Sequence, residues 1–86
     1  MGEAREVRLR RLGIRSWRRG TREMDLILGG FADAALAGLG DAEIEQFEAL
    51  LSENDHDLYR WIAGSEDGPK QHQEIVLRIR AHHSMG

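Results

Sequence analysis

Apolar residues recur at helical spacing along this chain, and that pattern most limits the folds open to it. Met24, Leu28, Phe31 and Ala35 lie at i, i+4, i+7 and i+11, which places them on one face of a helix. No stretch shows the period-two alternation of a half-buried strand. The chain has 86 residues, which is enough for one domain. The pattern therefore predicts a single all-α domain.

Glycine and proline divide the chain into helical segments. We expect five helices, over about residues 5–19, 21–37, from 41, from about 55 to 64, and from 69. Short connections between helices of this length favour a small five-helix bundle. We expect one domain over residues 1–86, with residues 1–8 frayed and residues 84–86 as a tail.

Several glycines have assignable roles in this pattern. Gly20 suits the end of the first helix, because glycine accepts the left-handed conformation there. Either Gly20 or Thr21 caps the second helix. The pair Gly29–Gly30 falls inside that helix and indicates either close helix packing or a bend.

Charge is distributed unevenly along the chain. Residues 1–22 hold eight arginines against two glutamates, whereas residues 23–67 hold twelve acidic residues against one arginine. Arginine makes planar, bidentate contacts to carboxylates and phosphates. The amino-terminal run is therefore either a solvated helix face or a recognition surface for nucleic acid, an anionic cofactor or an acidic protein.

Residues that carry catalysis or bind metals are poorly represented. The absence of cysteine excludes disulfides, thiolate metal sites and cysteine catalysis. No serine sits in a nucleophile elbow, and no carboxylates have the spacing of an acid–base pair. His72 and His83 can share one helix face but lack the further ligands that a metal needs. We expect no enzyme activity, no catalytic residues, no metal site and no tightly bound cofactor.

The densest cluster of charged residues is Arg18–Asp25, where three arginines and two acids surround the turn between the first two predicted helices. With Gly20 as N-cap, Glu23 can reach back to its amide in half a capping box. Asp25 then adds favourable charge near the helix start. Capping does not explain arginine on both sides of the turn, so the cluster is a candidate recognition surface.

Two motifs in the chain resemble those of a known family. Arg19-Gly20-Thr21-Arg22-Glu23 has the form Arg-Gly-x-x-Glu, and Asp57-Leu58-Tyr59-Arg60-Trp61 has the form Asp-Leu-aromatic-x-Trp. Together they resemble the SdhE family, the small flavinylation factors of succinate dehydrogenase. Over about residues 9–64 the likeness also includes Arg15–Arg18, Met24–Asp25, Phe31–Ala32 and Phe47–Leu51. The chain departs from the family at Asp55-His56-Asp57, where Asp-Pro-Asp is common, and at Gly13-Ile14, where larger or aromatic residues are expected.

The resemblance implies a five-helix bundle and a function that composition alone does not give. It implies an assembly factor that binds the flavoprotein subunit of succinate dehydrogenase, or of the related fumarate reductase. Such a factor promotes the covalent bond between a histidine of that subunit and the 8α-methyl of FAD. The chemistry belongs to the flavin and its protein, so the factor acts by positioning. It binds no FAD tightly by itself, and a monomer is the expected state.

The resemblance also suggests a partner-binding site at the turn. Arg19 and Glu23 are expected to face the partner, and Gly20 to keep the turn tight and allow close approach. The residues expected to extend the contact are Arg15, Arg18, Arg22 and Asp25.

Two other classes of binding protein remain as alternatives. The amino-terminal arginines favour a nucleic-acid-binding protein, although residues 23–67 are acidic and no helix-turn-helix or aromatic RNA platform is evident. An antitoxin-like partner protein is the other alternative. No apolar run is long enough to span a membrane. Glu3 and Glu6 interrupt the arginine-rich start, which favours a bacterial cytoplasm over a mitochondrial matrix.

Overall fold

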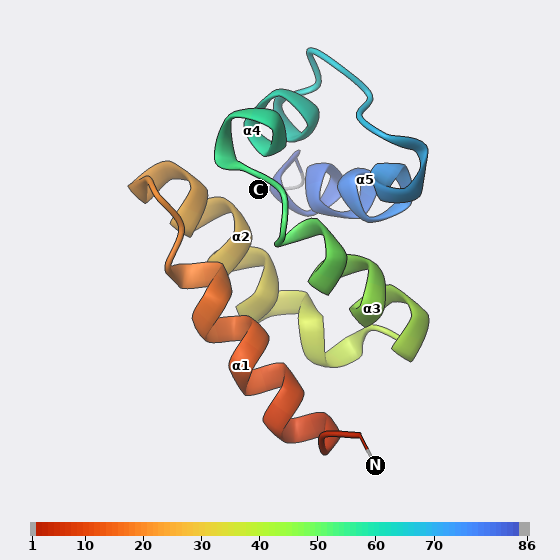
Figure 1. Cartoon of the computed structure of the whole chain (residues 1–86). Coiled ribbons are helices and arrows are strands. Elements are labelled where there is room, and N and C mark those ends of the chain that lie inside the picture. Colours follow the sequence, from red (N-terminus) through yellow and green to blue (C-terminus); the bar gives the residue numbers. More distant parts are fainter. Residues whose placement is uncertain (1, 85–86) are drawn as a thin grey trace.

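Over residues 2–84, five α-helices joined by short connections form the fold, which confirms the predicted all-α bundle (Figure 1). The computed structural model describes residues 2–84. The helices are α1 (Arg5–Trp17), α2 (Arg22–Ala35), α3 (Asp41–Leu50), α4 (Asp55–Ala63) and α5 (Lys70–Ser84), with a 3-10 turn, η1 (Leu36–Gly38), after α2. Helix α1 lies along α2, and α5 packs against α2, α3 and α4. Of the tail expected at 84–86, residue 84 ends α5, and residues 85–86 lie outside the described residues.

The core is built from the apolar stripes that the sequence predicts on the last four helices. The rings of Phe31 in α2 and Phe47 in α3 lie 5.6 Å apart, centroid to centroid. The apolar residues buried around them include Leu28, Ile44, Leu50, Leu58, Ile75 and Ile79. Each such side chain contributes roughly 1.5–3 kcal/mol when it is removed from water, so these stripes hold the four helices together.

Helix α1 contributes little to this core. Among its apolar residues Leu12 is fully buried, whereas Val7, Ile14 and Trp17 are 50, 48 and 39% exposed. Their spacing along the sequence is irregular, and they do not form one inward face. Exposed apolar side chains therefore line part of the outer surface of α1.

Ion pairs join α1 to α3. Nε and Nη2 of Arg8 lie 3.0 and 2.8 Å from Oε1 of Glu48, and Nη2 of Arg11 lies 2.9 Å from its Oε2. Burial acts to raise the pKa of the Glu48 carboxyl, but the two guanidinium groups outweigh burial and hold this pKa below its ordinary value of 4.5. Arg5 adds a further pair to Asp41, at 2.7 Å.

The glycine pair in α2 serves close packing. A Cβ atom at Gly29 would lie 2.3 Å from Cδ2 of Trp17, so the indole can rest on α2 only because position 29 lacks a side chain. At Gly30 the nearest atom to such a Cβ is Cε1 of His83, at 3.9 Å. Of the two alternatives that the sequence left open, close packing is therefore the one that Gly29 provides.

We predict opposite effects for alanine at these two neighbouring positions. Gly29→Ala should lower the free energy of unfolding by about 1–3 kcal/mol, because the new methyl group displaces the Trp17 ring. Gly30→Ala should raise it by up to about 1 kcal/mol, because alanine favours the helix and its methyl group would make only an ordinary van der Waals contact with His83. Urea unfolding followed by circular dichroism measures both. Equal effects of the two substitutions would contradict the packing described here.

We predict a pH-dependent loss of stability for Glu48→Gln. A carboxyl whose pKa is lowered by folding stabilises the protein above its unfolded pKa, and this contribution is lost as pH falls through the folded pKa. At pH 7 the variant should be less stable by about 1 kcal/mol, and the difference should disappear in acid below the folded pKa. Unfolding curves from pH 7 to pH 3 test this. Glu45→Gln, an exposed position on the same helix, is the control and should show no such trend.

Candidate functional site

The turn between α1 and α2 carries the Arg-Gly-x-x-Glu motif. Helix α1 closes with the Arg18 N–H donated to the Arg15 carbonyl, at 3.2 Å. Helix α2 begins at Thr21, whose hydroxyl accepts the Met24 N–H at 3.2 Å. Thr21 is therefore the N-cap, and the alternative assignment to Gly20 is wrong. Glu23 then falls on the second helical position and not the third, which removes the half capping box expected there.

The side chain of Arg19 turns inward and anchors this turn to the connection between α3 and α4. Its Nε donates to Oδ1 of Asp55 at 2.9 Å. Its Nη1 and Nη2 donate to the carbonyls of Leu51 and Glu53, at 2.7 and 2.8 Å. These carbonyls follow the end of α3, where helices leave acceptors unpaired and favour a cation. With its side chain only 12% exposed, Arg19 does not present its guanidinium outward as the sequence suggested.

Two carboxylates fix the backbone of the turn. Oδ2 of Asp55 accepts the Gly20 N–H at 2.7 Å, and Oδ1 of Asp25 accepts the Arg19 N–H at 2.6 Å. A Cβ at Gly20 would lie 2.9 Å from Oδ2 of Asp55. Among the described residues, the glycines with positive φ are Gly64 and Gly68, so the left-handed conformation expected at Gly20 is wrong. Glycine is favoured at position 20 because the Asp55 carboxylate approaches closely.

Asp55 is the residue of this site that sequence reasoning missed. In the sequence, Asp55 stands in the Asp55-His56-Asp57 segment at the start of a predicted helix, a common place for acidic residues. Its partners Arg19 and Gly20 lie 36 and 35 residues away along the chain. Only the packing of α4 against the turn reveals this contact.

The rest of the motif faces outward. Gly20, Thr21, Arg22 and Glu23 are all exposed. Beside them a hollow runs from the turn to α4. Its lining includes Met24 of α2 and, from α4, Asp55, His56, Tyr59 and Arg60. Tyr59 belongs to the second motif and is 43% exposed. The structure thus brings the two sequence motifs together on one surface, although they lie far apart along the chain.

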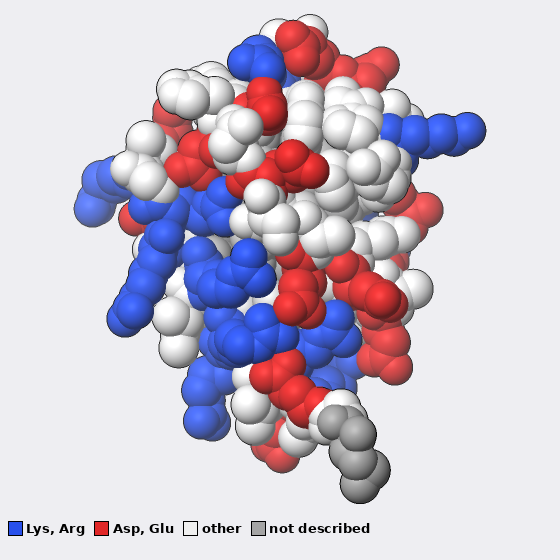
Figure 2. Space-filling model, in the orientation of Figure 1, with Lys and Arg blue, Asp and Glu red and all other residues white. Residues whose placement is uncertain are grey.

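The eight amino-terminal arginines fall into two sets. Arg5, Arg8, Arg11 and Arg19 each contact a carboxylate. In the part of the chain that the structure describes, the other four form no ion pair: Arg10, Arg15, Arg18 and Arg22. Figure 2 shows the basic side chains gathered over α1, with acidic side chains interleaved. The surface available to a polyanion is therefore smaller than the arginine count suggests.

The predicted site residues thus take different places. Gly20, Glu23, Arg18 and Arg22 are exposed, and Arg15 is half-buried on α1. Arg19 and Asp25 hold the turn from within. Within residues 2–84, no three His, Asp or Glu side chains are grouped closely enough to hold a metal ion. No helix over the same residues has the length and apolarity needed to cross a membrane.

Fold and site together define a small all-α domain that presents a charged turn held by internal hydrogen bonds. The model of the family described as "Flavinator of succinate dehydrogenase" matches residues 10–83. The chain belongs to this family, which confirms the resemblance seen in its motifs. It is similar to the "FAD assembly factor SdhE" of Legionella pneumophila (strain Lens), at 40% identity over 63 residues, which cover 73% of this chain and 80% of that protein.

Mitochondrial relatives show the same similarity over a smaller share of their length. The "Succinate dehydrogenase assembly factor 2, mitochondrial" of Mycosarcoma maydis is 46% identical over 59 residues, which are 69% of this chain and 25% of that protein. The protein of the same name in Meyerozyma guilliermondii is 39% identical over 66 residues, which are 77% of this chain and 49% of that protein. The chain therefore spans about a quarter to a half of these relatives.

We predict that the Arg19–Asp55 contact stabilises the fold. Arg19→Ala should lower the free energy of unfolding by roughly 2 kcal/mol, because it removes charged hydrogen bonds to three acceptors. The double variant with Arg19→Ala and Asp55→Ala should lose about 1 kcal/mol less free energy of unfolding than the sum of the two single losses, because the residues share one interaction. Denaturant unfolding of the single and double variants measures this coupling.

The matched control for this cycle is Glu23→Ala, an exposed position in the same motif. It should change the free energy of unfolding by about 0.5 kcal/mol or less. Strict additivity of the Arg19 and Asp55 losses would contradict the proposed coupling.

Proposed function

We propose that this protein is an assembly factor that binds the flavoprotein subunit of succinate dehydrogenase and promotes covalent attachment of FAD to it. Membership of the flavinator family supports the class of client. The relative from Legionella, of which the chain covers 80%, supports action in a bacterial cytoplasm. The flavoprotein of fumarate reductase is the second client that this proposal includes.

The observation that carries the proposal is that the charged side chains of the motif point in different directions. Arg19 is bound inside the protein, whereas Arg22 and Glu23 extend into solvent from the first turn of α2. We therefore assign Arg19 and Asp25 to positioning the turn. Glu23 and Arg22 make the charged hydrogen bonds to the client. Arg15 and Arg18 extend the contact along α1, and Gly20 lets the client backbone approach.

A rigid turn suits catalysis by positioning. The bond between a client histidine and FAD is made by the flavin and its own protein, so the factor needs only to hold the client in a productive conformation. A surface fixed by internal hydrogen bonds loses little conformational entropy on binding, which leaves more free energy for holding the client.

We also propose that the protein does not bind FAD tightly by itself. The hollow beside the motif is lined by the carboxylates of Glu23 and Asp55, which would repel a pyrophosphate. The motif turn also lacks the glycine-rich pattern that cradles phosphates. The flavin therefore stays with the client, and a monomer of this chain is the species that binds and releases it.

We predict that flavin attachment depends on Glu23 independently of stability. The flavoprotein subunit from the same organism is expressed in a host lacking its own factor, alone or with this protein. Covalent flavin is then read as fluorescence after denaturing electrophoresis. The band should depend on this protein and fall at least about tenfold with Glu23→Ala, the usual cost of losing a contact worth about 1.4 kcal/mol or more. The control Glu45→Ala, an exposed glutamate on α3, should leave the band unchanged.

Gly20→Arg provides a second arm of this experiment. The side chain should block the client surface and abolish the band while the variant keeps its helical circular dichroism. An unfolded Gly20→Arg variant would contradict the interface role of this position. A band of equal strength with and without the protein would contradict the proposed function itself.

A further inference from the structure

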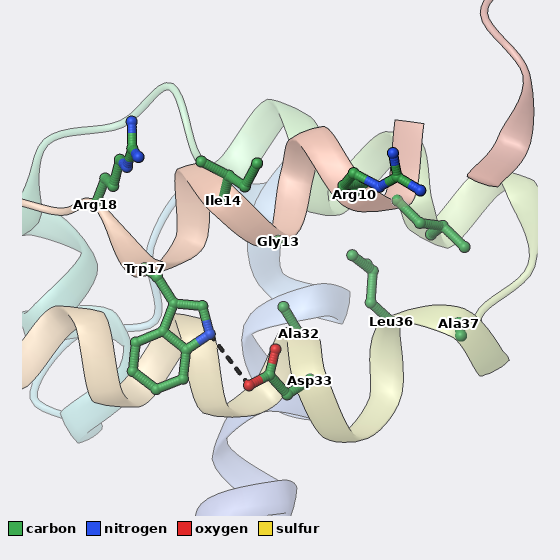
Figure 3. A pocket seen from close by; sticks show the side chains of 10 residues that line it. Arg10, Gly13, Ile14, Trp17, Arg18, Ala32, Asp33, Leu36 and Ala37 are labelled. Carbon is green, nitrogen blue, oxygen red and sulfur yellow. Dashed lines mark hydrogen bonds between the residues drawn. The ribbon is translucent and has the colours of Figure 1, made fainter. Parts of the chain in front are cut away.

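A groove runs between α1 and α2, separate from the hollow beside Glu23. Gly13 of α1 and Ala32 and Leu36 of the following elements line its apolar part. Figure 3 shows Trp17 lying between the two helices, with Arg10 and Arg18 toward opposite ends of the groove. The protein's own side chains line this space and leave it open.

Trp17 gives the groove a fixed aromatic wall. Its Nε1–H donates to Oδ2 of Asp33 at 3.2 Å, and its ring rests against Gly29. The side chain nonetheless stays 39% exposed, and neighbouring Ile14 is 48% exposed. A large aromatic side chain held in one orientation, with part of its surface in water, is typical of the anchors that dominate binding energy in protein interfaces.

Gly13 gives the groove its depth. Glycine destabilises a helix interior relative to alanine. Apart from its chain neighbours and the backbone of its own helix, no heavy atom lies within 4 Å of the place where its Cβ would be, so the packing of the fold does not require a glycine here. A side chain at position 13 would project into the open groove. The space above Gly13 is therefore available to an occupant from outside the domain.

The charges around the groove favour an acidic occupant. Arg10 and Arg18 are exposed and, among residues 2–84, form no ion pair. Asp33, the single carboxylate in the lining, already accepts the Trp17 N–H. Arg10 lies on α1 and Arg18 is the residue that follows its last turn, eight residues further on, which places them roughly 12 Å apart along the helix axis. An occupant that pairs with both must carry acidic groups about two helical turns apart.

We propose that this groove is a second docking surface for the client, and that it takes an acidic amphipathic segment of the flavoprotein subunit. Acidic residues two turns apart on that segment pair with Arg10 and Arg18, and an apolar side chain between them enters the space above Gly13. The inference rests on the proposed function for the identity of the client. With the motif turn, the groove gives two contacts that together fix the client's orientation.

The test measures the affinity of the full chain for the purified, FAD-loaded flavoprotein subunit of the same organism by titration calorimetry. Gly13→Gln fills the groove and should weaken binding at least about tenfold, while unfolding experiments show no loss of stability. Gly13→Ala, too small to fill the groove, is the matched control and should bind normally. Arg10→Glu should weaken binding by a similar factor and make it less sensitive to salt, whereas Lys70→Glu, an exposed position on α5, should not.

The outcomes separate this inference from the proposed function. If Glu23→Ala weakens binding but Gly13→Gln and Arg10→Glu do not, the groove inference is overturned and the proposed function stands. If the unsubstituted chain does not bind the subunit, both are overturned. If the chain self-associates in sedimentation equilibrium and Gly13→Gln abolishes this, the groove belongs to a second copy, which also overturns the inference.

Discussion

The guanidinium of Arg19 makes the contacts on which the arrangement of the candidate site depends. It joins the α1–α2 turn to the end of α3 and to Asp55, the first residue of α4. One side chain thereby connects four helices through charged hydrogen bonds, which are stronger than neutral ones. Asp55 also accepts the Gly20 N–H. The exposed half of the motif therefore extends from a backbone that these hydrogen bonds hold in place.

The same division between inward and outward arginines extends over the amino-terminal third of the chain. Arg8 and Arg11 neutralise Glu48 and attach α1, which has few buried apolar residues, to α3. The acidic middle of the sequence is thus partly a set of internal partners for the basic start. Of the amino-terminal arginines that form no ion pair among the described residues, Arg10 and Arg18 line the α1–α2 groove and Arg22 lies in the motif turn. The groove is suited to an acidic occupant, and less basic surface remains for nucleic acid than composition implies.

Local patterns predicted the helices well and the contacts between them poorly. The apolar stripes around Phe31 and Phe47 and the turn at Gly64 have short-range causes, namely helical periodicity and backbone sterics. The inward direction of Arg19 could not be predicted, because its partners lie 32 to 36 residues away. The reason for glycine at position 20 is also long-range, since it is the approach of the Asp55 carboxylate. Residue types alone therefore indicated the turn as a candidate site, but not that Arg19 is bound inside the protein.

The most direct test of this account is amide hydrogen exchange of the isolated protein at Gly20, measured by NMR. Gly20 is exposed, yet its N–H is donated to Asp55 at 2.7 Å, so we predict that this amide exchanges more slowly than in an unstructured peptide. Asp55→Ala should accelerate exchange at Gly20 more than at Arg19, whose amide is bound by Asp25 instead. Exchange of the Gly20 amide at the rate of an unstructured peptide in the unsubstituted protein would contradict the central claim that Asp55 and Arg19 hold the turn in place.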